Sequence, residues 1–193
     1  MAATYPSGIY APREKENKSG VVYNADKKTI VFAEDLIKLD EEVVAVETEL
    51  GQNPSSRIRA FRSTPNQTIP TTEETKVQFN AEDYDRYNEY DITTNHRFTA
   101  LGTGYYIVQA QIQFDEITSG TPTELIAKKN GAVITRYVHT PGQGAALILA
   151  LTDIIYLSAT DYIEIYCYHE CAGSVDLVNG TANSFLAIHK LSA

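Results

Sequence analysis

Residues 57–193 consist largely of short segments in which apolar and polar residues alternate. In residues 104–115, for example, Tyr106 and Val108 fall on one face of an extended chain and Gln109 and Gln111 on the other. Glycine, proline and asparagine between the segments indicate turns. We expect strands at 58–63, 77–80, 87–93, 96–100, 104–115, 123–130, 132–139, 145–152, 162–169 and 184–191. About ten short strands at this spacing predict a mainly β, antiparallel sandwich or jelly roll.

One of these strands is apolar on both faces. Residues 145–151 read Ala-Ala-Leu-Ile-Leu-Ala-Leu, and residues 185–188 repeat the feature. In a two-layer sandwich only one face of each sheet meets the core, so the second face needs another cover. A symmetric contact between subunits supplies it. The alternative is cover by the chain's own loops or by an N-terminal helix.

The strand at 162–169 carries tyrosines on the face opposite Ile163 and Ile165. Tyrosine buries apolar area while its hydroxyl stays in water, which suits both subunit interfaces and carbohydrate contacts. We favour the subunit interface over the carbohydrate contact. The predicted trimer interface therefore comprises Leu147, Leu149, Leu151, Tyr162, Tyr166, Tyr168 and Phe185.

Residues 1–56 have a different organisation and form a separate N-terminal region in our interpretation. Residues 1–20 show neither helical nor strand period, and their prolines and glycines favour an extended arm. Residues 21–23 and 29–32 are typical of a small hairpin. The apolar and aromatic residues of this region suit docking on another protein, so we predict attachment through Tyr5, Ile9, Tyr10 and Tyr23.

A short helix is predicted at 34–50, ended by Gly51 and Pro54. Its apolar residues recur at steps of three and four, as in the seam of a coiled coil. The seam consists of Leu36, Leu39, Val43, Val46 and Leu50. Because a helix of this length is marginal in water by itself, the seam must pack on something. We expect self-association around a three-fold axis, with packing on the chain's own sheet as the alternative.

Charge and cysteine content limit the partners and the compartment. The formal net charge of -9 argues against duplex nucleic acid as a partner, because phosphate binding needs a surplus of Lys and Arg. Cys167 and Cys171 lie four residues apart in a strand-like segment, too far for a disulfide unless the chain turns, so we expect free thiols. Residues 1–20 lack the apolar core of a signal peptide, and no stretch suits membrane insertion. Synthesis and assembly in a cytoplasm are expected.

No motif in the sequence indicates catalysis or a cofactor. The four histidines are scattered over different predicted strands and lack the spacing of zinc ligands. The acidic run at 82–85, with Glu89 and Asp91 nearby, offers oxygen ligands for calcium, but a solvated loop is the favoured interpretation. Neither a phosphate-binding loop nor a nucleophile elbow is present. We expect a protein that is not an enzyme.

Several short motifs of residues 58–192, in their order and spacing, resemble the complement first-component-type globular head, a tumour necrosis factor-like jelly roll. These motifs are Phe79-Asn80, Tyr90-Asp91, Phe98-Thr99, Gly104-Tyr105-Tyr106, Lys129-Asn130-Gly131, Leu157, Asp161-Tyr162 and Phe185. The resemblance implies ten strands in two sheets and a compact homotrimer whose inner sheet contains the strands that are apolar on both faces. The collagen-like tract that precedes such heads in complement proteins has no counterpart here.

Parts of residues 22–54 resemble the leading segment of bacteriophage fibre and other virion structural proteins. The resemblance rests on residues 22–26, 32–36, 42–49 and 50–54. It implies that residues 1–56 attach a trimeric head, residues 57–193, to the capsid or tail of a virion, as a decoration, fibre or spike. The alternative is a receptor-binding adhesin that recognises a host surface glycan.

Overall fold

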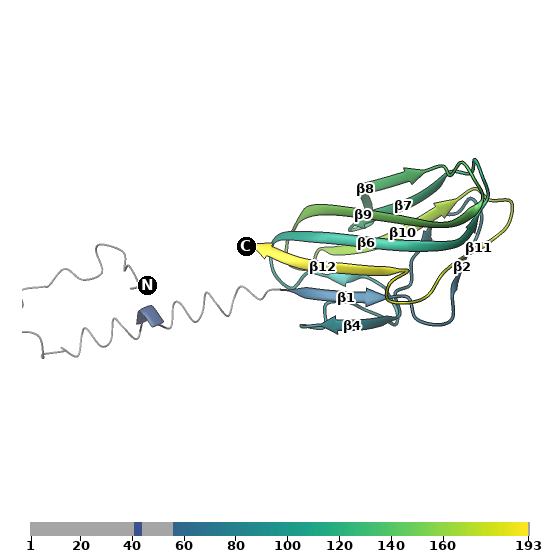
Figure 1. Cartoon of the computed structure of the whole chain (residues 1–193). Coiled ribbons are helices and arrows are strands. Elements are labelled where there is room, and N and C mark those ends of the chain that lie inside the picture. Colours follow the sequence, from purple (N-terminus) through teal and green to yellow (C-terminus); the bar gives the residue numbers. More distant parts are fainter. Residues whose placement is uncertain (1–40, 44–55, 193) are drawn as a thin grey trace, which may run out of the picture. The chain divides into compact units, whose positions relative to one another are not determined.

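The computed structural model describes residues 41–43 and 56–192 (Figure 1). Residues 41–43 are helical and the Val43 side chain is exposed. Apart from Ser56, which is buried in the head, the rest of the predicted N-terminal region lies outside the described residues. That includes the arm, the hairpin, the attachment residues Tyr5, Ile9, Tyr10 and Tyr23, and the seam residues Leu36, Leu39, Val46 and Leu50.

Residues 57–192 form twelve strands. Their bounds are β1 Arg57–Phe61, β2 Gln67–Ile69, β3 Thr75–Lys76, β4 Ala81–Asp85, β5 Phe98–Thr99, β6 Gly104–Ile117, β7 Thr123–Lys129, β8 Ala132–His139, β9 Ala145–Leu157, β10 Tyr162–His169, β11 Val175–Leu177 and β12 Phe185–Ser192.

The strands form two antiparallel sheets that face each other. The seven-stranded sheet has the order β2-β11-β6-β12-β1-β4, and β9 pairs with β6 on the side opposite β12. The five-stranded sheet has the order β3-β10-β7-β8, and β5 also pairs with β10. Strands β8 and β9 adjoin at one edge of the sandwich, and β4 lies at the far edge of its sheet (Figure 1).

The core lies between the sheets and is made of the inward-facing residues of both. Phe98 and Tyr106 meet edge to face at 5.7 Å between ring centroids, and Phe114 packs in the same way on His169. The Tyr106 hydroxyl donates a hydrogen bond to the carbonyl of Gly102, so this buried aromatic residue leaves no polar atom unpaired. Cys167 and Cys171 are buried free thiols, which confirms the prediction, and burial raises the pKa of Cys167.

The longest predicted strands are confirmed. Those at 58–63, 104–115, 123–130, 132–139, 162–169 and 184–191 match observed strands to within about two residues, and the one at 145–152 runs on to Leu157. The predicted 96–100 is reduced to the two residues of β5, whereas β2, β3, β4 and β11 were not predicted. The described residues therefore contain twelve strands instead of ten, because two predicted strands are absent and four others are present, of which β2, β3 and β11 have only two or three residues and β4 has five.

Two predicted strands are wrong, and their hydrogen bonds explain why. Residues 77–80 are irregular, although Val77 and Phe79 are fully buried. The N–H group of Gln78 donates to the side chain of Gln67 instead of to a neighbouring strand. The alternation of apolar and polar residues at 77–80 therefore predicts correctly which side chains are buried, but it does not indicate a strand. Residues 87–93 form no strand because aspartate carboxylates accept hydrogen bonds from several of their backbone N–H groups. The acidic run at 82–85, predicted to be a solvated loop, belongs to the edge strand β4.

The turn between β7 and β8 follows directly from two residues. Asn130 and Gly131 have φ values of 50° and 82°, as a two-residue hairpin turn with left-handed backbone requires. Asparagine and glycine adopt such values at the lowest cost. The predicted Asn130-Gly131 hairpin is confirmed.

Asp161 links this turn to the one between β9 and β10. Its carboxylate accepts hydrogen bonds from the Asn130 side chain at 2.7 Å and the Ser158 N–H at 2.8 Å, and pairs with Lys129 Nζ at 2.8 Å. These donors, with Lys129 and Asn130 as the largest contributors, lower the pKa of Asp161 to about 2.

A carboxyl group with a lowered pKa stabilises the folded chain above its unfolded pKa of about 4 and loses that contribution as the pH falls toward 2. We therefore expect the melting temperature of the parent chain to fall between about pH 4 and pH 2 more steeply than that of Asp161→Asn. Circular dichroism melts across this range measure the difference. Parallel curves for the two proteins would contradict the assignment.

Candidate functional site

The most prominent surface of the head is an exposed apolar region at one edge of the sandwich. Eight large apolar side chains from β8, β9 and the start of β6 are exposed there, out of twelve in the described residues. They are Tyr105, Val133, Ile134, Tyr137, Val138, Ile148, Ile154 and Tyr156. We call this set the apolar edge. Its concentration in three adjacent strands distinguishes it from the single exposed apolar residues that are normal on any protein.

Strand register brings the apolar edge together. Tyr105 pairs with Tyr156 across β6 and β9, and their rings meet edge to face at 5.2 Å. Ile107 pairs with Ile154 in the next outward-facing row. Further along, Gln109 and Gln111 make the outer face of β6 polar, as their spacing predicts.

Strand β8 forms the other part of the apolar edge. It is the last strand of the five-stranded sheet, so one side of its backbone has no partner strand among residues 56–192. The Thr135 hydroxyl donates to the Asp153 carboxylate on β9, which connects the edges of the two sheets. An exposed, apolar edge strand is a surface that natural proteins ordinarily cover.

The prediction of the interface residues on β9 requires a correction. Leu149 and Leu151 are 1% and 6% exposed, and Leu147 packs against the same core. The outward residues of this strand are Ile148, at 56% exposed, and Ile154, at 59%. The expectation that the first part of the strand is apolar on both faces is confirmed. The residues predicted for the interface, however, are those that face the core. Because side chains alternate along a strand, an error of one residue exchanges the core face for the outer face.

The other predicted interface residues lie on two different surfaces. Tyr162, Tyr166 and Tyr168 are half-buried on the outer face of the five-stranded sheet. There Arg97 lies over the Tyr162 ring at 4.3 Å, and Lys128 lies over the Tyr166 ring at 4.0 Å. Phe185 is half-buried on the outer face of the seven-stranded sheet, beneath Arg59. The structure therefore does not bring the tyrosines of β10 together with β9 within one chain.

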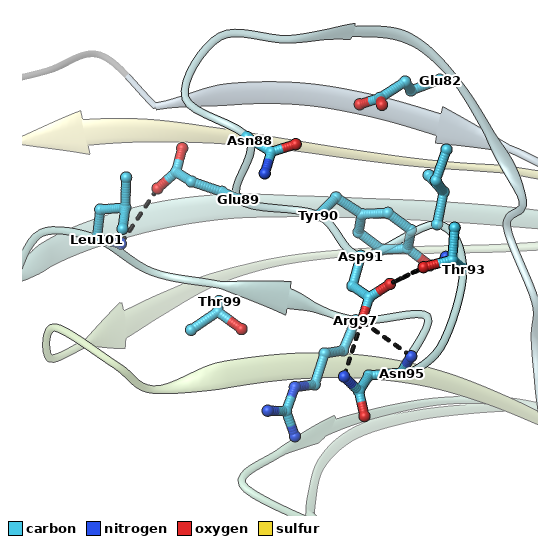
Figure 2. Close-up of a pocket in the computed structure, with 11 residues that line it drawn as sticks. Glu82, Asn88, Glu89, Tyr90, Asp91, Thr93, Asn95, Arg97, Thr99 and Leu101 are labelled. Carbon is cyan, nitrogen blue, oxygen red and sulfur yellow. Dashed lines mark hydrogen bonds between the residues drawn. The ribbon is translucent and has the colours of Figure 1, made fainter.

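A second candidate site is a polar pocket of about 470 Å³ between β4 and β5 (Figure 2). Its lining residues are Glu82, Asn88, Glu89, Tyr90, Asp91, Ile92, Thr93, Asn95, Arg97, Thr99 and Leu101. The pocket shares no residue with the apolar edge. Most of its lining comes from the segment between the two strands.

Glu89 is the most deeply placed carboxylate of the polar pocket, and its side chain is partnered on one oxygen only. Oε1 accepts hydrogen bonds from the Ser56 hydroxyl at 2.8 Å and from the Leu101 N–H at 3.2 Å, the second of which Figure 2 shows. Oε2 is buried and has no partner. Burial is the main cause that raises the pKa of Glu89, and the nearby Asp85 raises it further.

Two further residues of the pocket lining each carry a buried atom without a partner. Glu82 Oε2 is buried without a partner, and burial followed by the charge of Asp85 raises the pKa of Glu82. The Tyr90 hydroxyl makes at most a weak interaction with the Phe79 carbonyl, and burial strongly raises the pKa of Tyr90. With Glu89 Oε2, these are all the buried side-chain oxygen and nitrogen atoms without a partner in the described residues.

Asp91 is used to hold the wall of the pocket. Its carboxylate accepts hydrogen bonds from the backbone N–H groups of Thr93, Thr94 and Asn95 at 2.9 to 3.1 Å. Figure 2 shows Asp91 beside Thr93 and Asn95. These bonds, with Thr94 and Thr93 first, lower the pKa of Asp91 well below its usual range. The oxygen atoms weighed from the sequence as calcium ligands are therefore partly engaged. Among residues 41–43 and 56–192, no group of three or more His, Cys, Asp or Glu side chains is placed to hold a metal ion.

From the sequence, Glu82, Glu89 and Asp91 were considered only as possible calcium ligands, and the pocket that they line was not predicted. The pocket depends on the irregular path between β4 and β5, where Asn88 and His96 adopt positive φ values. Within the described part of the chain, no helix is long and apolar enough to span a membrane.

Comparison with known proteins leaves the family open and identifies the fold. No protein-family model matches the chain. The uncharacterized protein YqcC of Bacillus subtilis (strain 168) is 30% identical in an alignment 152 residues long that covers 70% of this chain. The chain spans only 41% of the length of that relative.

Solved structures of tumour necrosis factor-family ligands are similar to the chain in fold. Murine APRIL superimposes with a TM-score of 0.55 and 15% sequence identity, over 71% of this chain and 99% of APRIL. Eiger TNF from S. frugiperda gives a TM-score of 0.53 and 13% identity, over 72% of this chain and 94% of Eiger. The head of this chain is an antiparallel jelly roll of the tumour necrosis factor-like fold, as predicted.

Proposed function

We propose that this chain is a non-enzymatic bacteriophage virion structural protein. Its head assembles as a homotrimer, and residues 1–56 attach the trimer to the capsid or tail as a decoration, fibre or spike. The observation that carries the assembly is the apolar edge on β6, β8 and β9. A trimer of this fold places copies of one chain against each other, so the apolar edge of each copy is covered by its neighbour.

Two physical arguments favour cover by copies of the same chain. A contiguous apolar surface on a free head promotes non-specific association, whereas a closed ring of three copies removes it from water. Each chain also carries a formal charge of -9, so three chains repel one another. Association must therefore be driven by burial of apolar area at about 25 cal/mol per Å².

The attachment role of residues 1–56 rests on their resemblance to the leading segments of phage virion proteins. The predicted arm and hairpin contain aromatic residues such as Tyr5, Tyr10 and Tyr23, which suit docking on a protein surface. The proposed location is the virion, after assembly in the host cytoplasm.

The virion role predicts where the chain is found. Particles purified from a culture of the phage or prophage that encodes the chain should contain it, detected by mass spectrometry and by antibody labelling. Deletion of residues 1–56 should remove the head from the particles. Recovery of the full chain only in the particle-free fraction would contradict the proposal.

A second candidate function is a receptor-binding adhesin that recognises a host surface glycan. The polar pocket between β4 and β5 favours it, because amide, hydroxyl and carboxylate groups converge there beside the apolar side chain of Leu101. Binding of the full chain to host cells, and its loss after removal of surface polysaccharide, distinguishes an adhesin from a purely structural head.

A further inference from the structure

A second surface pocket, of about 640 Å³, lies where the end of β4 meets the start of β1 (Figure 1). Its lining residues are Arg57, Tyr84, Asp85 and Arg86, and we call it the arginine pocket. It shares no residue with the apolar edge or with the polar pocket between β4 and β5. Neither the proposed trimer contact nor the polar pocket therefore accounts for its side chains.

The fold holds two like charges side by side in the arginine pocket. Asp85 pairs with Ile58 across β4 and β1. One position further along, the Arg86 N–H group donates a hydrogen bond to the Arg57 carbonyl at 3.3 Å, so the two arginines are cross-strand neighbours. Like charges at opposite positions of neighbouring strands repel each other. Because arginine is always charged in proteins, only an anion relieves this repulsion.

The head supplies no such anion from its own described side chains. Within residues 56–192, no carboxylate forms an ion pair with Arg57 or with Arg86. The carboxylate of Asp85, in the pocket lining, already accepts hydrogen bonds from the N–H groups of Tyr87 at 3.1 Å and Tyr90 at 2.7 Å. The other arginines of this part of the chain have their own partners, which are Asp83 for Arg59, Glu74 and Glu124 for Arg136, backbone carbonyls for Arg62 and the Tyr162 ring for Arg97.

The lining of the arginine pocket favours an oxyanion as its ligand. A guanidinium group donates parallel N–H bonds whose spacing matches the oxygen atoms of phosphate and carboxylate groups. Tyr84 is 49% exposed, so its ring and hydroxyl are available to the rest of a ligand that carries such a group. The volume of about 640 Å³ lies within the range of about 300–1,000 Å³ that is usual for small-molecule sites.

From these observations we propose that the arginine pocket binds a phosphate or carboxylate group of a small anionic ligand, such as an acidic sugar. Arg57 and Arg86 donate hydrogen bonds to the oxygen atoms of this group, and Tyr84 contacts the carbon skeleton that carries it. The inference goes beyond the proposed functions, because it requires neither the homotrimer nor the polar pocket. It gives a role to two adjacent arginines in a chain whose formal net charge is -9.

Saturation-transfer NMR on the full chain at low ionic strength tests the proposal with three sugars. Glucose phosphorylated on its primary hydroxyl, glucuronate and glucose share one ring and differ in the charged group. At least one of the two acidic sugars should give saturable transfer with a dissociation constant on the order of 1 mM, and glucose should bind at least about tenfold more weakly. The two acidic sugars also distinguish phosphate from carboxylate as the preferred group.

Substitutions of the arginines locate the binding. Arg57→Gln and Arg86→Gln should each weaken it at least about fivefold, because each removes one guanidinium group from the pocket. Both side chains are exposed, so the variants should keep the circular dichroism spectrum of the parent. The matched control is Arg136→Gln, which removes the same charge from an exposed position on β8 and should bind as the parent does.

Three results would overturn the proposal. The first is the absence of saturable binding by both acidic sugars, and the second is equally strong binding of glucose. The third is an equal loss of binding in all three glutamine variants, because the effect would then follow the net charge of the chain and not the arginine pocket.

Discussion

Replacing Ile148 and Ile154 by glutamate is expected to convert the homotrimer into folded monomers. Both side chains are more than half exposed on the outer face of β9 and belong to the apolar edge. Burial of an unpaired carboxylate in an interface costs several kcal/mol, and three copies would bury six. The concentration needed for assembly should rise by more than about 100-fold. Light scattering should show the mass falling to that of one chain, 21.4 kDa.

The matched control is the double change Tyr84→Glu and Leu101→Glu. It adds the same charge at exposed apolar positions outside the apolar edge and should leave the mass unchanged. Circular dichroism should show that both double variants retain the β-sheet spectrum. The single variant Ile154→Glu, which keeps Ile148, should retain part of the assembly. An Ile148→Glu, Ile154→Glu chain that keeps the parent mass would show that β9 is not in the interface.

Leu149→Ala is expected to destabilise the subunit by about 2–5 kcal/mol. The neighbouring outward residue is Ile148, but Leu149 points the other way and is 1% exposed in the core. Truncation leaves a cavity between the two sheets that the surrounding strands fill only in part. The midpoint of urea unfolding should fall by about 1–2 M at a fixed protein concentration.

Leu101→Ala is the control for this truncation. It deletes the same atoms from an exposed leucine and should change the stability by no more than about 0.5 kcal/mol. If Leu149→Ala unfolded at the parent midpoint but lost assembly, Leu149 would lie at the interface, as the sequence first suggested. The burial of the inner face of β9 in the core would then be wrong.

The fold was predictable from the sequence where strands are long and one-sided. Strand β6 alternates between buried apolar residues and outward residues, among them three glutamines, over most of its length. A period of two over so many residues predicts a strand. The turn at Asn130-Gly131 was predictable because it needs residues that tolerate positive φ. The short strands β2, β3 and β11 carry too few residues to show a period.

The candidate sites were harder to predict, for two physical reasons. On β9 both faces are apolar near its start, so the pattern gives no sign of which face meets the core, and Leu149 was placed outward wrongly. The polar pocket depends on tertiary contacts such as the Ser56 hydroxyl on Glu89, which join residues 33 positions apart. No local pattern reports such a contact. The sequence shows the surplus of carboxylates at 82–91. It does not show which of them accept hydrogen bonds from backbone N–H groups and which have an oxygen without a partner.

The central claim is that copies of this chain cover the apolar edge. Analytical ultracentrifugation of the full chain at micromolar and lower concentrations tests it most directly. The account predicts a single species of about 64 kDa, three times the 21.4 kDa chain, that persists on dilution. A stable, soluble species of 21.4 kDa across the same concentrations would contradict it.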